Sequence, residues 1–431
     1  MTISAMTIIS ALFSAQLTSR LKEKWIVIIS IGLTVLALFL FSIAIKYWNL
    51  FLFAIPYGLG AGSIDAAVNN FVAIHYSSRV MNFLHCFYGV GSMISPNIMA
   101  LALKYKSWKE GYRWTAYIQL GILFICFATI PLWKIGKEEI EQKDKGENAE
   151  KNKEDAKKEI EESNNRIIKI KIENSSKNYK EEKEEVGTKE DFTKKEEKED
   201  KSKTIGKEEV NVVSILDAIK IKGVIFSCIA FFAYSSGEGT CFLWTSSFFD
   251  GTKEGLSKET IASLSTTIFG GLMLGRVLSG LVSERLGDKA LIRIGLIIEA
   301  IGIICVGIPI KTYILAVIGY CLTSIGMGPI YPSIQHLVPI YFGKEASPTI
   351  IGLQMASAYL GTTLMPFIFG LIQAKTSMWA HPIYIGFFAI LNFIFIEIEF
   401  KLCDKNLKDN IETKKKNNIE ENNSIENNRN N

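Results

Sequence analysis

The sequence predicts an all-α protein that crosses a membrane many times. Uncharged apolar runs of about 20 residues, the length that spans a bilayer, recur in both halves of the chain, as in Trp25 to Ile45 and Val80 to Leu103. Hydrophobic residues make up 48% of the chain, although one central segment is almost wholly charged. The runs also lack the short alternation of apolar and polar residues that is typical of a transmembrane β-barrel.

The first part of the chain contains five predicted spans. Its opening run, residues 1–18, has no Lys or Arg before it, and the first cations follow at Arg20, Lys22 and Lys24. A secretory signal has the reverse arrangement, so this run is expected to be a spanning helix. The next four spans are predicted at 25–45, 48–74, 80–103 and 113–134. Residues 1–136 should therefore form an N-terminal bundle of five helices.

A charged segment separates this bundle from a second one. Residues 137–210 consist mainly of Lys, Glu, Asp and Asn, and such a segment cannot bury enough apolar surface to fold, so we expect a disordered linker. Residues 211–402 should form a second bundle of six helices. Its spans are predicted at 220–249, 260–282, 290–309, 312–341, 347–373 and 378–399. The tail, 403–431, is rich in Lys, Asn and Glu and is expected to be disordered.

The distribution of Lys and Arg in the short loops predicts the orientation. These cations gather in alternate loops, as at Arg20, Arg79, Arg285 and Lys344. The linker and the tail lie on the same side, which we expect to be the cytoplasmic side of a plasma or inner membrane. The loop after the fourth span departs from this rule because it also contains cations, at Lys104, Lys106, Lys109 and Arg113.

Composition argues against several functional classes. The net charge of +4 arises from charges of both signs in one linker rather than from a basic surface, so no nucleic-acid binding is expected. The seven cysteines are scattered and lack the spacing of metal ligands or of a disulfide framework, and no cofactor is predicted. The chain has neither a GxxxxGK[ST] motif nor a nucleophile and base at a recognisable spacing. We therefore predict no enzyme activity.

An internal repeat relates the two halves. The segment LTSRLKEK at 17–24 aligns with VSERLGDK at 282–289, an offset near 265 residues. Almost the same offset places Gly60 and Gly62 over Gly326 and Gly328. One span, 220–249, precedes the second copy, whereas the first copy has no equivalent. Five plus six spans are best explained as six plus six with the first helix missing from this sequence.

These features resemble the major facilitator superfamily. That family has two sets of six helices, a long central loop and a basic loop after the second helix of each half, with the pattern Gly, three residues, an acid, Arg, any residue, Gly, then charges. The segment GLVSERLGDK, 280–289, is similar to this motif, with Glu284 where the family usually has Asp. In the first half only Arg20 clearly matches. The resemblance implies two pseudo-symmetric bundles with eleven helices present, and it implies gating residues at Gly280, Glu284, Arg285, Gly287, Asp288 and Lys289.

Within that superfamily, one stretch resembles the fucose-permease-like sugar:proton symporters. It is GLGAGSIDAAVNN, 58–70, followed by MNFLHCFYGVG, 81–91. In that branch a carboxylate of the fourth helix takes part in proton coupling and sugar binding, and the matching position here is Asp65. A second acid lies on the family's first helix, which this sequence lacks.

The residues themselves also single out Asp65. An ionised Asp at mid-membrane costs about 2.5 to 3.5 kcal/mol, so it normally faces a water-filled cavity or a polar partner. Asn69 lies four residues on and hence on the same helical face. Glycines at 58, 60 and 62 would let neighbouring helices approach closely. We expect Asp65 to carry the proton and to contact substrate together with Asn69, the alternative being a purely structural interhelical hydrogen bond.

Further candidates come from both bundles. Glu238 is a second intramembrane carboxylate between two glycines, and we expect it to take part in proton coupling and substrate binding. Arg276 lies deep in its span and needs an anion. Asp65 and Glu238 are candidate partners, and a structural pair with the basic-loop motif is the simpler explanation. Trp244 offers a ring face for a sugar, or else marks the lipid interface. The remaining predicted substrate contacts, each with packing as its alternative role, are His85, Gln335 and Gln354.

The sequence therefore predicts a secondary active transporter that moves a small polar solute, a sugar, by proton-coupled alternating access. Its expected partners are the solute, protons and the lipid bilayer, and it should act as a monomer. Two alternatives remain open, namely an exporter of drugs or amphiphiles and a transport-inactive membrane sensor or scaffold.

Overall fold

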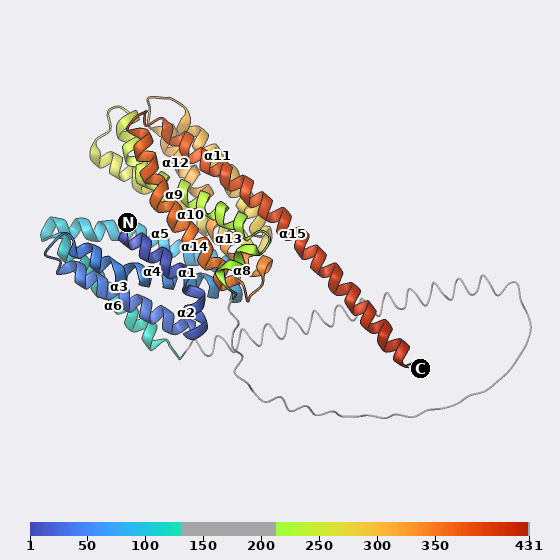
Figure 1. Cartoon of the computed structure of the whole chain (residues 1–431). Coiled ribbons are helices and arrows are strands. Elements are labelled where there is room, and N and C mark those ends of the chain that lie inside the picture. Colours follow the sequence, from blue (N-terminus) through green and yellow to red (C-terminus); the bar gives the residue numbers. More distant parts are fainter. Residues whose placement is uncertain (132–212, 430–431) are drawn as a thin grey trace, which may run out of the picture. The chain divides into compact units, whose positions relative to one another are not determined.

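The computed structural model describes residues 1–131 and 213–429, and every element assigned in these ranges is a helix (Figure 1). The predicted linker, 137–210, lies outside the described residues. Eight helical segments among the described residues are long and apolar enough to cross a membrane, and one of them, Ile314–Phe342, joins α12 and α13. The number is nine if one bent pair, Thr2–Leu12 with Ser14–Arg20, forms a single span. The predicted all-α membrane fold is confirmed.

The N-terminal bundle contains the predicted spans in order. Its helices are α1 (Thr2–Leu12), α2 (Ser14–Arg20), α3 (Glu23–Ser42), α4 (Asn49–His75), α5 (Ser78–Tyr105) and α6 (Trp108–Ala128). The first predicted span is bent by 53° between α1 and α2. Helix α4 packs against α1 on one side and against α3 on the other.

Glycines on α4 allow these two close approaches. A Cβ added to Gly58 would lie 2.5 Å from the Ile3 carbonyl oxygen of α1, and one added to Gly60 would lie 2.6 Å from the Ser30 carbonyl oxygen of α3. Any larger side chain would push the neighbouring helix away. The close approach expected from the alternating glycines is thus present, and it fixes the position of the α4 segment that follows them.

The second bundle contains eight helices in the described residues. They are α8 (Ile215–Lys220), α9 (Val224–Thr252), α10 (Lys258–Leu286), α11 (Asp288–Gly307), α12 (Ile314–Met327), α13 (Ile330–Phe342), α14 (Ser347–Gln373) and α15 (Ala380–Arg429). The span predicted at 312–341 is present as one apolar span, Ile314–Phe342, in which Gly328 and Pro329 separate α12 from α13. Proline has no backbone N–H to donate, which explains a break at this point.

The C-terminal tail differs from the prediction. Instead of becoming disordered at residue 403, α15 continues as one helix to Arg429. Its first part, including Phe388, Ile396 and Phe400, is buried in the bundle. Adding residues to an existing helix costs much less than starting a new one, so the packed first part supports a polar continuation that would not begin a helix alone.

One helix of the second bundle has no counterpart in the first. Helix α9 packs along α14 and α15, which are the last two helices of its bundle. The last two helices of the first bundle, α5 and α6, instead expose large apolar side chains, among them Phe87, Ile94, Phe124 and Ile125. No described helix covers them in the way that α9 covers α14 and α15. This arrangement agrees with the predicted five plus six helices.

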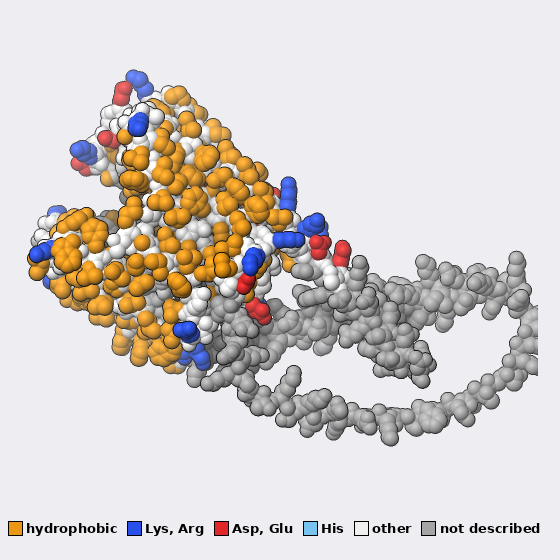
Figure 2. All heavy atoms as spheres, in the orientation of Figure 1, with side chains coloured by type: hydrophobic (Ala, Val, Ile, Leu, Met, Phe, Trp, Pro, Cys, Tyr) orange, Lys and Arg blue, Asp and Glu red, His pale blue; other side chains and the backbone are white. Residues whose placement is uncertain are grey.

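The two bundles meet mainly where α5 packs on α10 and α1 packs on α14. Gly352 allows α14 to approach α1 closely, because a Cβ there would be 2.5 Å from the Ala11 carbonyl oxygen. The space-filling view shows a hollow between the bundles (Figure 2), on the side away from α8 as labelled in Figure 1. The bundles are therefore closed together on the side of α8, here called the linker side, and open on the opposite side.

Gly352→Ala is expected to destabilise the protein by about 1 to 3 kcal/mol, because the added methyl group overpacks the contact between α14 and α1. Thermal unfolding in detergent measures this effect. Gly32→Ala is the matched control, since a Cβ on Gly32 meets nothing within 4 Å and alanine favours a helix. Equal unfolding temperatures for the two variants would contradict the close contact.

Candidate functional site

Asp65 lies near the middle of α4, partly buried, between the two bundles. Nδ2 of Asn69, one turn further along α4, donates to Asp65 Oδ1 at 3.1 Å. The hydroxyl of Tyr359, on α14 of the other bundle, donates to Asp65 Oδ2. No cation pairs with Asp65 in the part of the chain that the structure describes. Two neutral donors therefore hold this carboxylate, and one of them crosses between the bundles.

Glu238 of α9 belongs to a second polar cluster. It accepts a hydrogen bond from the Tyr234 hydroxyl at 3.0 Å, and Nη2 of Arg276 lies 3.5 Å from its Oε1. The Arg276 side chain is only 2% exposed. Its Nη1 donates to the backbone carbonyl of His85, in the first bundle, at 2.8 Å. Among the partners considered for Arg276, the structure selects Glu238 rather than Asp65, and the expected pair with the basic-loop motif is not formed among the described residues.

Tyrosines lie between and around these two clusters. Tyr331 packs its ring against His85, with centroids 4.7 Å apart, and against Tyr234, with centroids 6.0 Å apart. The Arg276 guanidinium lies 5.6 Å from the ring centroid of Tyr88. The site thus combines hydroxyl groups, an amide and aromatic faces with two carboxylates.

Sequence reasoning did not select these tyrosines. Tyr359 is 294 residues from Asp65, and no local pattern links two positions so far apart. Two signals were nevertheless present. Tyr234 precedes Glu238 by four residues, which is the spacing of helical neighbours, and the internal repeat aligns Tyr331 with Asp65.

The other predicted contacts divide into two groups. His85 and Gln335 are buried near Asp65: the His85 ring contacts Tyr331, and Gln335 Nε2 donates to Met355 Sδ, which also accepts from Asn69. Gln354 instead donates to Ser227 Oγ at 2.7 Å. Trp244 Nε1 donates to the Pro366 carbonyl at 2.9 Å, and its indole packs on Phe369. The structure does not bring Gln354 or Trp244 into contact with the Asp65 cluster.

The predicted gating motif lies where the bundles meet on the linker side. Asp288 Oδ1 accepts from Ser78 Oγ of α5 at 2.5 Å. Its Oδ2 lies 2.7 Å from Nδ1 of His336, whose Nε2 lies 3.2 Å from the Tyr76 carbonyl oxygen of the first bundle. Glu284 faces Arg79 of α5 at 3.9 Å. Asp288 therefore connects the two bundles directly through Ser78 and indirectly through His336.

The other residues of the motif lie at or near the junction of α10 and α11. Gly287 adopts a φ of +73° at the end of α10, a conformation that favours glycine. A Cβ on Gly280 would meet Phe83 and Asn82 of the first bundle at 3.3 and 3.4 Å. Lys289 pairs with Asp404 of α15 rather than with the first bundle. Arg285 is exposed in the last turn of α10.

Asp288→Ala is expected to weaken closure on the linker side, because it leaves Ser78 and His336 without their shared acceptor. Spin labels at positions 22 and 345, in a background without native cysteines, should show a new, longer distance in pulsed spin-resonance measurements. Asp404→Ala is the matched control, since Asp404 pairs with Lys289 within the second bundle. An unchanged distance distribution in Asp288→Ala would show that this contact does not hold the bundles together.

Comparisons with known proteins agree with this architecture. The chain matches the family model described as Major Facilitator Superfamily over residues 1–269 and 227–421. It is similar to a crystal structure of the transporter FucP in the outward conformation, with a TM-score of 0.64, 14% sequence identity, and coverage of 92% of this chain and 89% of that chain. A second structure, of the E. coli fucose:proton symporter FucP, has the same TM-score and identity and covers 92% and 90%.

The proton:xylose symporter XylE bound to 6-bromo-6-deoxy-D-glucose is also similar, with a TM-score of 0.63, 11% identity, and coverage of 93% of this chain and 84% of that chain. No curated protein matches the sequence. At these identities the structural likeness concerns the fold alone, whereas the family model matches both bundles. Together with the two bundles and the bridging motif, this match shows that the chain belongs to the major facilitator superfamily of membrane transporters.

Proposed function

We propose that this protein moves a small polar solute of the sugar class together with a proton, by alternating access. The observation that carries the proposal is the hydrogen bond from Tyr359 to Asp65, because it joins a titratable group of one bundle to the other bundle. Asp65 is partly exposed and contacts Tyr359 of the other bundle. A change in its charge therefore acts on the contact that alternating access must break and remake.

The coupling follows from hydrogen-bond chemistry. An ionised carboxylate only accepts hydrogen bonds, which suits the two donors Tyr359 and Asn69. A proton on either oxygen converts that oxygen into a donor and weakens its bond to the neighbouring donor. A proton on Oδ2 thus loosens the bond across the bundles, and protonation of either oxygen removes a charge that would be costly to enclose in a dry site.

A sugar fits the polar groups around Asp65. Its hydroxyl groups both donate and accept hydrogen bonds, and its ring presents apolar faces that pack on aromatic side chains. Asp65, Asn69 and the tyrosine hydroxyls supply acceptors and donors, while Tyr88 and Tyr331 supply ring faces. This mixture favours a sugar over the drugs or amphiphiles of the exporter alternative, which call for a more apolar cavity.

Glu238 and the remaining predicted residues have secondary roles in this proposal. Its ion pair with Arg276 makes Glu238 a fixed counter-charge, and its part in proton coupling stays a prediction. The linker side is cytoplasmic in our proposal, in the plasma or inner membrane, so the hollow faces outward. The transporter acts as a monomer.

Uptake into proteoliposomes tests the proposal. Purified protein is reconstituted, and labelled hexoses, deoxyhexoses and pentoses are supplied with and without an inward proton gradient. At least one sugar should accumulate only with the gradient, and a protonophore should abolish the accumulation. Uptake that is indifferent to pH would overturn symport, and extrusion of a hydrophobic dye in place of sugar uptake would support the exporter.

A further inference from the structure

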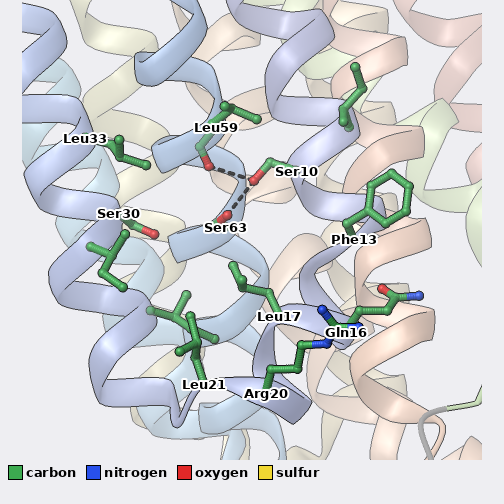
Figure 3. A pocket seen from close by; sticks show the side chains of 13 residues that line it. Ser10, Phe13, Gln16, Leu17, Arg20, Leu21, Ser30, Leu33, Leu59 and Ser63 are labelled. Atoms are coloured by element: carbon green, nitrogen blue, oxygen red, sulfur yellow. Dashed lines mark hydrogen bonds between the residues drawn. The ribbon is translucent and has the colours of Figure 1, made fainter.

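A groove of 620 Å³ opens on the first bundle, away from the site around Asp65 (Figure 3). Helices α1 and α2 form one wall, α3 forms the other, and Leu59 and Ser63 of α4 contribute to the lining between them. The 53° bend between α1 and α2 lies within the first wall. Most of the lining is apolar: Ile9, Phe13, Leu17, Leu21, Ile29 and Leu33. The side chains of Phe13 and Ile29 are 58% and 47% exposed, so the groove is open at the outer surface of the bundle.

The two ends of the groove differ in polarity. At one end, Ser10 donates to the Leu59 carbonyl at 2.6 Å and contacts the Ser63 hydroxyl, so these groups satisfy one another. Gln16 and Arg20 lie at the other end (Figure 3). Gln16 Oε1 is buried without a hydrogen-bond partner, and Arg20 forms no ion pair within the described part of the chain. This end therefore offers an unused cation and an unused buried acceptor.

These two groups and the apolar walls match one chemical class of ligand. The Arg20 guanidinium suits a phosphate group, which it can bind through two parallel hydrogen bonds. Gln16 Oε1 needs a donor, and a headgroup hydroxyl supplies one. Ile26 and Leu33 line the groove on the continuous helix α3 and are seven residues apart, about 10 Å along a helix, which lies within half of a hydrocarbon core of about 30 Å. An acyl chain of one leaflet fits this length.

We propose that the groove binds one anionic phospholipid with a hydroxylated headgroup, such as phosphatidylglycerol, whose phosphate contacts Arg20 and whose headgroup hydroxyl donates to Gln16. Charge complementarity supports this occupant. Arg20 lies on the side expected to be cytoplasmic, beside Lys22 and Lys24, and anionic lipids are attracted to such basic juxtamembrane segments. A free phosphate would leave the apolar walls unused.

Native mass spectrometry of the full-length protein in a mild detergent tests the proposal. Phosphatidylglycerol should bind at one molecule per chain and at least tenfold more tightly than phosphatidylcholine. Arg20→Gln should weaken the binding of phosphatidylglycerol about tenfold. Lys24→Gln is the matched control, because it removes the same charge from the same segment but lies outside the groove, over the Trp25 ring. Lys24→Gln should bind phosphatidylglycerol with the same affinity as the unaltered protein.

Gln16→Leu tests the headgroup contact separately. It should weaken the binding of phosphatidylglycerol but not of phosphatidic acid, which has a phosphate and no headgroup hydroxyl. Unchanged unfolding temperatures in lipid-free detergent show that each variant is folded. Equal losses in Arg20→Gln and Lys24→Gln would show unspecific attraction and overturn the site, as would displacement of the lipid by inorganic phosphate alone. Because the readout is binding, neither result depends on the proposed transport activity.

Discussion

Asp65→Asn is expected to abolish proton-driven accumulation of the solute while leaving exchange of solute across the membrane in place. Asparagine has nearly the same shape and keeps an oxygen that accepts from Tyr359, but it cannot ionise. The accumulation ratio under a pH gradient should fall to about 1, because a site without a titratable group cannot couple the two movements. Counterflow, in which labelled solute exchanges with unlabelled solute, should persist.

Proteoliposomes with and without a pH gradient measure both activities. Asp217→Asn is the matched control, because Asp217 is exposed on α8 and its carboxylate bonds to its neighbours Ser214 and Lys220. It should leave accumulation unchanged. Accumulation that survives in Asp65→Asn would assign the coupling to another acid, with Glu238 the first candidate.

Arg276→Gln is expected to destabilise the protein by about 3 to 5 kcal/mol, because removing one partner of a buried ion pair leaves the other charge uncompensated. The substitution also removes the charged donor to the His85 carbonyl, which joins the bundles. Thermal or denaturant unfolding in detergent measures the loss.

Two further variants separate the causes of this loss. Glu238→Gln combined with Arg276→Gln leaves no buried charge in the pair, so the double variant should recover most of the stability. Arg293→Gln is the control for an exposed pair, because Arg293 and Glu397 are 49% and 21% exposed, and exposed pairs contribute about 0.2 to 1 kcal/mol. If Arg276→Gln lowers the free energy of unfolding by no more than Arg293→Gln does, the buried pair contributes no more to stability than an exposed pair.

Local rules predicted much of the fold. Runs of apolar residues gave the spans because a bilayer sets their length, and the internal repeat gave the division into five and six helices. The apolar run that continues through Gly328 and Pro329 correctly predicted a single span there, Ile314–Phe342. The extension of α15 was missed, since composition alone does not show that a polar segment continues an existing helix.

Site residues were predictable in two cases: where a charged side chain costs free energy inside a membrane, and where two residues are neighbours on one helix. Asp65 is the first case, because an ionised carboxylate within a membrane span is unfavourable unless it has a polar partner or faces water. Asn69 is the second case, because it lies four residues further along the same helix. Glu238 was one of the partners considered for Arg276, but Tyr359 and the backbone carbonyl of His85 lie far along the chain from Asp65 and Arg276, so only tertiary packing brings them together. Tryptophan is common in sugar-binding sites, but Trp244 contacts the Pro366 carbonyl and the Phe369 ring instead of the Asp65 cluster.

The pairing of Arg276 with Glu238 has an electrical consequence for the proposed cycle. Because those two charges cancel, the ionised carboxylate of Asp65 leaves the empty site with one net negative charge, and a proton together with an uncharged sugar makes the loaded site neutral. A transmembrane voltage acts on a unit charge with about 2.3 kcal/mol per 100 mV. The voltage therefore drives the return of the unloaded carrier rather than the step that carries the sugar.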